Sequence, residues 1–151
     1  MVRFGVLLNG GLLQPPLLFV RYAWALPASL VGIALVLMLL ASGGRARVHK
    51  GVWEASGGLP GKLLANGMPF SGPVAAITFG HVVLGDCEDS LCSTRAHERE
   101  HVRQYERWGI LFFPAYLIAG LIAWIRGGDP YRDNVFEVAA RKAETASRSG
   151  E

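Results

Sequence analysis

The sequence is poor in the features on which disulfide-rich, nucleic-acid-binding and repeat proteins depend. It has only two cysteines among 151 residues, which excludes a disulfide framework. Charged residues make up 18% of the chain, and the net charge of +3 is dispersed, whereas nucleic-acid binding needs a clustered basic face. No internal repeat or low-complexity tract is present. We therefore expect a modest core and no nucleic-acid partner.

Apolar residues, by contrast, are abundant and make up 51% of the sequence, which points to membrane segments. Tyr22–Ser42 is uncharged throughout, and about 20 such residues are enough for a membrane-spanning helix. A buried core helix is the alternative. Residues 1–20 lack a small-residue cleavage site, so we do not expect a cleaved signal peptide. We predict an N-terminal apolar region at 1–44, with one transmembrane helix at about 22–42.

Charges and cysteines near this run indicate a compartment. More basic residues follow the run than precede it, namely Arg45, Arg47 and Lys50 against Arg3 and Arg21. The positive-inside rule then favours the cytoplasmic side for the C-terminal part. Cys87 and Cys92 suit a reducing compartment. No second cysteine pair accompanies them, so we interpret them as ordinary thiols.

Two stretches after the apolar run have the pattern of strands. Arg45–Glu54 alternates in the manner of a strand, and Pro73–Gly85 is a second candidate. Gly57–Gly72 is rich in Gly and Pro and predicts a loop. A short β-ribbon is therefore expected. His81 falls in the second strand, where a lone histidine is more often structural than a participant in a site.

His97, Glu98 and His101 form an H-E-x-x-H pattern. On a helix, residues four apart lie on one face about 6 Å apart along the axis, so two imidazoles can bind one metal ion. Glu98 directly follows His97 and lies beside the two histidines on the helix surface. From there its carboxylate can act as general base and accept a proton from water. The alternative is an exposed charged helix with ion pairs such as Glu100 with Arg103.

The residues around the pattern predict the ends and the inner face of this helix. We interpret Asp86–Thr94 as a polar connector before the helix. Ser93 or Thr94 is a suitable N-cap, and Gly109 is expected to end the helix. The face of the histidines continues with Gln104, Tyr105 and Trp108, whereas another face carries Arg95, Arg99, Arg103 and Arg107. The histidines are therefore expected to look inward, as metal ligands must.

A second uncharged run, Ile110–Ile125, follows this helix. As a helix it would be about 24 Å long, which is shorter than the hydrocarbon core of about 30 Å. Pro114 and Gly120 weaken it further as a straight span. After a break at Asp129-Pro130, Asn134–Ser147 predicts an amphipathic helix.

A catalytic zinc ion needs three protein ligands and one open position. No histidine follows His101, and Gln104 and Arg107 occupy the places where the metzincin pattern has Gly and a third His. A third ligand after the motif must then be a carboxylate, and five are candidates: Glu106, Asp129, Asp133, Glu137 and Glu144. Glu137 is best placed, mid-helix between apolar residues. The alternative is a surface glutamate paired with Arg141.

The motif His97-Glu98-x-x-His101, followed by Asn134-x-x-Glu137-x-x-Ala140 on a later helix, resembles the gluzincin branch of the zincin metallopeptidases. The small membrane-embedded members, of the heat-shock and CAAX-processing type, are closest in style because they insert apolar segments between the two motif helices. The resemblance covers about residues 75–145. It implies that His97, His101 and Glu137 bind Zn²⁺ and that Glu98 activates water. Candidates for supporting a ligand or stabilising an oxyanion are Gln104, His81, Tyr105, Tyr116 and Tyr131.

This resemblance also constrains residues 110–125. If this run crossed the bilayer, Glu137 would lie on the opposite side from His97 and could not share its metal ion. Arg107 and Arg126 flank the run, which favours both ends on one side of the membrane. We therefore expect 110–125 to be re-entrant or surface-packed within a zincin-like domain at 45–151.

The predicted fold is α+β, mainly α: a membrane-anchored, zincin-like minimal domain with a short β-ribbon before the H-E-x-x-H helix. The functional hypothesis is a membrane-associated zinc metallopeptidase that hydrolyses a peptide or protein substrate, with the lipid bilayer as its other partner. Two alternatives remain. One is a non-catalytic membrane protein with a structural zinc site, closed by a fourth ligand such as His81 or Cys92. The other is a protein with a decayed protease motif.

Overall fold

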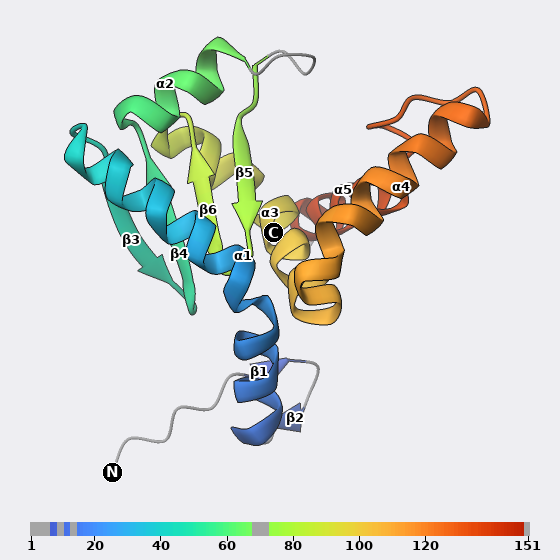
Figure 1. Cartoon of the computed structure of the whole chain (residues 1–151), viewed down its shortest axis with the longest axis horizontal. Coiled ribbons are helices and arrows are strands. Elements are labelled where there is room, and N and C mark those ends of the chain that lie inside the picture. Colours follow the sequence, from blue (N-terminus) through green and yellow to red (C-terminus); the bar gives the residue numbers. More distant parts are fainter. Residues whose placement is uncertain (1–6, 9–10, 13–14, 68–72, 150–151) are drawn as a thin grey trace.

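The computed structural model describes residues 7–8, 11–12, 15–67 and 73–149 (Figure 1). The predicted class is confirmed: the fold is α+β and mainly helical, with a four-stranded mixed sheet before a long helix. The helices are α1 (Pro15–Ala41), α2 (Gly58–Asn66), α3 (Glu88–Trp108), the 3₁₀ turn η1 (Gly109–Leu111), α4 (Phe112–Ile125) and α5 (Val135–Ser149). The strands are β1 (Leu7–Leu8), β2 (Gly11–Leu12), β3 (Arg45–His49), β4 (Val52–Ser56), β5 (Ala76–Phe79) and β6 (Val82–Gly85).

The main sheet is larger than the expected ribbon. Its strand order is β3-β4-β6-β5, and each of the two predicted strand regions forms an antiparallel hairpin. The two hairpins are joined by the parallel pair β4 and β6, with Trp53 opposite Val82. The predictions of one strand over 45–54 and of one strand over 73–85 were both wrong, because Gly51 at φ +79° and Gly80 at φ +60° each allow a tight turn inside the region. The second turn also holds His81, which is therefore not a strand residue.

Helix α1 covers one face of this sheet and α3 covers the other. Val36 and Leu39 of α1 pack with Ala55, Val82 and Leu84 of the sheet. Val83, whose side chain points to the opposite face, packs instead with Leu91 and Val102 of α3. The period of two along each strand therefore supplies both layers with apolar contacts.

A stripe of small residues brings α1 close to the sheet. A Cβ atom on Gly32 would lie only 2.5 Å from Cβ of Val82, so no larger side chain fits there without displacement. Ser29 donates to the carbonyl of Ala25 and accepts a hydrogen bond from the main-chain N–H of His81 at 3.0 Å. The helix itself begins at Pro15, before the predicted start near residue 22.

Two local predictions were wrong. Part of the predicted loop 57–72 is α2, because Leu64 packs into the core and Pro60 lies in the first turn, where proline is tolerated. Residues 68–72 of that loop lie outside the described residues. The motif helix starts earlier than expected: Cys87 is its N-cap and accepts from Ser90 N, while the hydroxyl of Thr94 donates to the carbonyl of Ser90. The hydroxyl of Ser93 donates to the same carbonyl.

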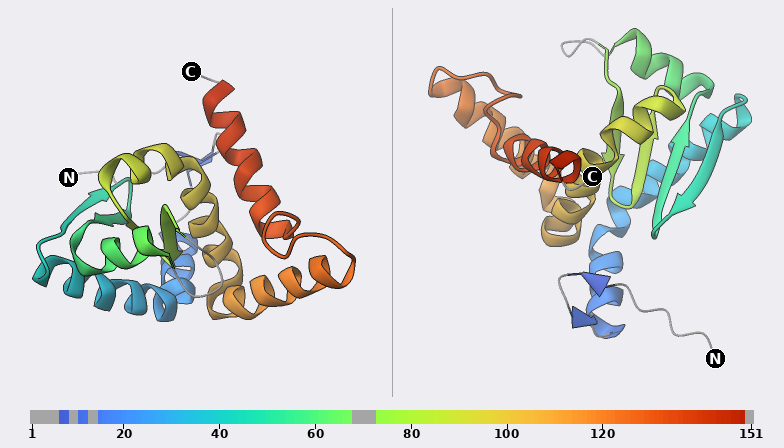
Figure 2. Two further views of the ribbon diagram at one scale, coloured as in Figure 1. Left: turned by 90° about the horizontal axis from the view of Figure 1, so that it is seen from above. Right: turned by 180° about the vertical axis from the view of Figure 1, so that it is seen from behind.

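The C-terminal half of the chain is a helical hairpin that returns to α3. Gly109, at φ +56°, ends α3 as predicted, and α4 follows the 3₁₀ turn. Asn134 then caps α5: its Oδ1 accepts from Phe136 N, and its Nδ2 donates to the carbonyl of Tyr116 on α4. Figure 2 shows α4 leading away from α3 and α5 coming back to lie against it. This return brings α5 onto the face of α3 that carries the motif.

In the part of the chain that the structure describes, two helical segments are long and apolar enough to cross a membrane. They are Phe19–Ala41 and Glu88–Ile125, whose most apolar 18-residue windows have mean hydropathies of 2.3 and 1.9. Length and composition alone do not separate a membrane helix from the core helix of a soluble protein or from a signal sequence. The membrane question therefore depends on how these helices pack.

Candidate metal centre

Two histidines of α3 and one glutamate of α5 meet where these helices pack together. His97 and His101 are one turn apart on α3, and Glu137 lies in the first turn of α5. One possible ligand atom from each of the three lies within 4.8 Å of the others. His101 and Glu137 are buried, and His97 is half-buried. The structure thus brings together a His/His/Glu group that could hold a metal ion.

The spacing of these atoms suits a tetrahedral ion. The Nε2 atoms of His97 and His101 are 3.1 Å apart. Glu137 places Oε2 3.4 Å from Nε2 of His97 and Oε1 3.2 Å from Nε2 of His101. Bonds of about 2.0–2.1 Å at tetrahedral angles place zinc ligand atoms about 3.4 Å apart. In addition, Oε2 of Glu137 is buried without a hydrogen-bond partner, and a cation would satisfy it. The three residues could therefore hold a metal ion.

Gln104 determines which nitrogen of His101 is free to bind metal. Its Nε2 donates to the main-chain carbonyl of Phe136 at 3.0 Å, so its Oε1 must be the atom that faces His101. That oxygen is 2.8 Å from Nδ1 of His101 and can only accept, so Nδ1 carries the proton. Nε2, which points at Glu137, is then the nitrogen that can offer a lone pair.

A carboxylate lies behind His97 in a corresponding position. Oε2 of Glu144 is 3.7 Å from Nδ1 of His97, and Oε1 of Glu144 pairs with Arg148 at 2.7 Å. At 3.7 Å this is an electrostatic contact and not a hydrogen bond, and a carboxylate in this place favours a proton on the outer nitrogen of His97. Glu144, one of the five candidate third ligands, therefore lies behind a histidine and not in the group that could hold the ion.

Glu98 is the best-buried carboxylate of the motif, at 5% exposure. Oγ1 of Thr78, on the neighbouring strand β5, donates to its Oε2 at 2.7 Å. Strand β5 is an edge of the sheet and packs beside α3. The hydroxyl therefore fixes the orientation of the Glu98 side chain and leaves its other oxygen for a different partner.

The protonation states of Glu98, His101 and Glu137 depend on one another. Burial would raise the pKa of Glu137, but the neighbouring imidazoles of His101 and His97 outweigh this effect and hold the pKa well below its usual range. Burial would lower the pKa of His101, yet hydrogen bonding to Glu137 and the nearby Glu98 raise it. Burial raises the pKa of Glu98, and His101 and Thr78 oppose this only in part. The pocket thus favours positive charge beside Glu137, which a proton or a metal ion can supply.

Two of the predicted tyrosines lie near Glu137. The hydroxyl of Tyr116 donates to Oε1 of Glu137 at 2.9 Å. Burial and, to a smaller extent, the negative charge of Glu137 raise the pKa of Tyr131 to about 12. This phenol therefore keeps its proton at neutral pH and is available as a hydrogen-bond donor.

Other candidate residues lie elsewhere. Tyr105 is in the core and packs edge-on against Phe112, at 4.4 Å between ring centroids. His81 stacks on Tyr22, and its Nε2 is 3.2 Å from Oε1 of Glu106. Glu106 is therefore engaged away from the group. Asp129 and Asp133 organise the loop between α4 and α5, where they accept main-chain hydrogen bonds.

The two cysteines are exposed on α3 and its N-cap, also outside the group. Sγ of Cys92 lies 3.4 Å from a guanidinium nitrogen of Arg95 and 3.7 Å from one of Arg47. Both arginines bind Glu54, which is buried in β4. Cys92 thus borders an ion-pair cluster that ties the sheet to α3.

Sequence reasoning missed two partners of the group: the hydroxyl of Thr78 and the main-chain carbonyl of Phe136. Thr78 is a common strand residue, and only the pairing of β5 beside α3 gives it a role. A main-chain carbonyl has no signature in a sequence at all. The alternation of β5, which places Thr78 on the face opposite Ile77, was the one available signal.

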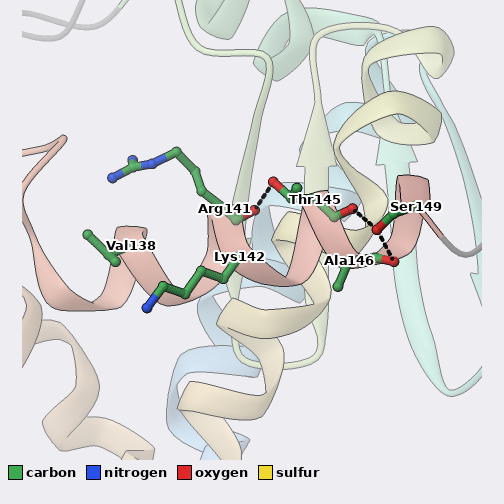
Figure 3. Close-up of a pocket in the computed structure, with 6 residues that line it drawn as sticks. All are labelled: Val138, Arg141, Lys142, Thr145, Ala146 and Ser149. Carbon is green, nitrogen blue, oxygen red and sulfur yellow. Dashed lines mark hydrogen bonds between the residues drawn. The ribbon is translucent and has the colours of Figure 1, made fainter.

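A shallow, open pocket lies along one side of α5 (Figure 3). All of its lining residues belong to α5: Val138, Arg141, Lys142, Thr145, Ala146 and Ser149. None of them is a histidine, a cysteine or a carboxylate. Arg141 connects this pocket to the group, with Nη1 3.9 Å from Oε2 of Glu137. The pocket along α5 is therefore a basic margin of the candidate centre and not a second metal site.

Comparisons with protein-family models, curated proteins and solved structures found no match. The candidate centre therefore depends on its own geometry. The likeness to gluzincins stays a resemblance of motifs.

Proposed function

We propose that this protein is a membrane-associated, zinc-dependent metallopeptidase. The observation that carries the proposal is the meeting of His97, His101 and Glu137, with Glu98 one residue along the same helix. When bound there, a zinc ion supplies Lewis acidity: it polarises a peptide carbonyl and lowers the pKa of water towards about 7.

The proposed role of Glu98 is general base and then general acid. Its carboxylate accepts a proton from the attacking water and passes this proton to the leaving amine as the peptide bond breaks. Its burial removes competing water, and the hydrogen bond from Thr78 holds one of its oxygens in place. Gln104 keeps His101 in the tautomer that a metal ion requires.

The edge strand β5 supports a peptide substrate in particular. It is the outermost strand on one side of the sheet, and its residue Thr78 contacts Glu98, the proposed base. An extended peptide can add to such an edge through main-chain hydrogen bonds. A scissile bond held in this way would lie next to the metal helix.

The rival function is a structural zinc site, which needs a fourth protein ligand. Within the described residues, the group of ligand-type side chains contains three members. The two residues considered for closing it, His81 and Cys92, have partners elsewhere, in Glu106 and in Arg95. This arrangement favours an open fourth position, as catalysis requires.

The experiment compares peptide hydrolysis by wild type and Glu98→Gln, each loaded with zinc. We expect Glu98→Gln to keep its zinc and to lose at least 10²-fold in turnover, the scale of a general base. Glu88→Gln is the matched control, because Glu88 is exposed in the first turn of the same helix and contacts Arg47. Full activity in Glu98→Gln would contradict the mechanism. No hydrolysis by zinc-loaded wild type would leave only a metal-binding protein.

A further inference from the structure

None of the four tryptophans is in the core. Trp24 is 47% exposed, Trp53 42%, Trp108 45% and Trp124 64%. Tryptophan is highly buried on average in soluble proteins, because the exposure of its large apolar ring to water is unfavourable. It is enriched at membrane interfaces, where one end of the ring is apolar and the other is wet. The exposure of all four rings therefore points to an interface that the protein alone does not provide.

The tryptophans accompany two unpartnered apolar helix faces. On α1, Leu26, Leu30 and Leu37 are each about half exposed or more. On α4 the same holds for Phe113, Leu117, Ile118, Leu121 and Ile125. Beyond α1, Trp53 and its cross-strand partner Val48 extend the apolar surface onto the sheet, on the face that α1 covers. These side chains form what we call the apolar face.

The exposed apolar sides of α1 and α4 face in the same direction. The buried stripe of α1 packs on the sheet, and the buried residues of α4, such as Phe112 and Ala123, look towards the body of the protein. In Figure 1 both helices lie in front, and the view from above in Figure 2 places them along one edge, with the sheet and α5 behind them. Trp24 of α1 lies against Gly109 of η1, the turn that leads into α4, and Ala25 of α1 packs with Phe112 at the start of α4. The apolar face is thus one surface.

The packing of α1 is incompatible with a simple span. Its stripe from Gly32 to Leu39 is covered by the sheet, whose opposite face carries the buried Glu54 with its two arginines. A bilayer around α1 would have to take in this sheet and its charges, which hydrocarbon does not tolerate. Helix α4 does not span either. Its 14 residues extend about 21 Å, and the loop after it carries exposed Arg126, Asp129 and Asp133.

We propose that the apolar face docks on the surface of a lipid bilayer, with α1 and α4 lying in a single leaflet and neither helix crossing it. Basic residues at the ends of these helices support lipid as the occupant. Arg21 lies in the N-terminal half of α1 and pairs with Glu106. The exposed Arg107, near Glu100, and the exposed Arg126 flank the segment from η1 to the end of α4, where they can reach anionic headgroups. This proposal replaces the span expected at 22–42 and goes beyond the proposed peptidase activity, on which it does not depend.

The first test uses the native tryptophans as probes. Purified protein is mixed with vesicles of phosphatidylcholine and phosphatidylglycerol whose acyl chains carry bromine, a fluorescence quencher, either near the headgroup or near the chain end. We expect binding, with stronger quenching by the shallow bromines. Ile118→Glu on the apolar face should weaken binding several-fold, whereas Lys142→Gln on α5 should not. Absence of quenching, together with dimers in sedimentation, would mean that a second copy covers the face and would overturn the proposal.

The second test separates docking from spanning. In a Cys87→Ser/Cys92→Ser background, Arg21→Cys and Arg45→Cys place single thiols at the two ends of the expected span. A membrane-impermeant maleimide is added to right-side-out and inside-out vesicles from expressing cells. Docking in one leaflet predicts that both thiols react in the same kind of vesicle. Reaction of the two thiols in opposite kinds of vesicle would show that α1 crosses the bilayer and would overturn the proposal.

Discussion

The side-chain amide of Gln104 donates to the main-chain carbonyl of Phe136 and so links α3 to the first turn of α5. The same amide accepts from Nδ1 of His101. One residue therefore sets both the tautomer of a candidate ligand and the position of the helix that brings Glu137. The centre is built at a helix–helix contact, and small changes in that contact should alter metal affinity.

Gln104→Leu should weaken zinc binding by about 10- to 100-fold, because His101 loses the acceptor that fixes its tautomer and the Phe136 carbonyl loses its donor. Competition against a chromogenic chelator measures the affinity. Gln104→Glu keeps the acceptor on His101 and should lose less. Equal affinities for Gln104→Leu and wild type would show that the amide does not support the ligand.

Thr78→Val should lower turnover while leaving the zinc content unchanged, because it removes only the hydroxyl that orients Glu98. This hydrogen bond lowers the pKa of Glu98 against the effect of burial. The acidic limb of the pH–rate profile should therefore move to higher pH in the variant. Thr78→Ser restores the hydroxyl and should restore the profile. An unchanged profile in Thr78→Val would assign Thr78 a purely structural role.

The metal-free protein should lose stability as the pH rises through neutrality. Burial opposes the charge on His101, but Glu137 and Glu98 raise its pKa, and burial raises the pKa of Glu98. Glu98 thus gives the folded state extra protons from about pH 4.5 upwards and His101 from about pH 6.5 upwards, so both contributions to stability fall as the pH rises. The low pKa of Glu137 has the opposite effect, and its contribution is lost as the pH falls below about 4.5.

Thermal unfolding of the metal-free protein between pH 4 and pH 9 checks this dependence. We expect the highest midpoint between these two limits and a flatter profile in His101→Asn. Zinc should remove the loss at high pH, since the ion replaces the protons of the group. A midpoint that rises steadily up to pH 9 without metal would contradict the assignment.

Gly32→Val should destabilise the fold by about 1–3 kcal/mol, because the added atoms meet Val82 in a packed contact between α1 and the sheet. Denaturant unfolding in mild detergent measures the change. Val31→Ala is the matched control, since Val31 is the next residue and is exposed. No effect of Gly32→Val would mean that α1 does not pack on the sheet and would reopen the question of a span.

The parts of the fold that follow from local pattern could be predicted from the sequence. Gly109 ends the motif helix because a residue with positive φ is needed there. The amphipathic period of residues 134–147 correctly predicts α5, whose buried Glu137 and Ala140 face α3. The helical spacing of His97 and His101 likewise places both on one face. In each case neighbours in the sequence are sufficient.

The features that depend on contacts between distant segments could not be predicted in this way. The parallel pairing of β4 with β6 joins two hairpins that look independent in the sequence. The apolar run in α1 is compatible with a span or with a core helix, and the contacts that favour packing on a sheet, such as Gly32 against Val82, join residues far apart in the sequence. The role of Thr78 is equally invisible until β5 lies beside α3.

The most direct test of the account is the metal content of the purified protein in detergent. Wild type, His101→Ala and Glu137→Ala are compared, with Glu106→Ala as a control, because Glu106 lies on the same helix but outside the group. We expect one zinc ion per chain in wild type and in Glu106→Ala, and none in the other two variants. Absence of zinc from wild type, or its retention in both ligand variants, would contradict the central claim.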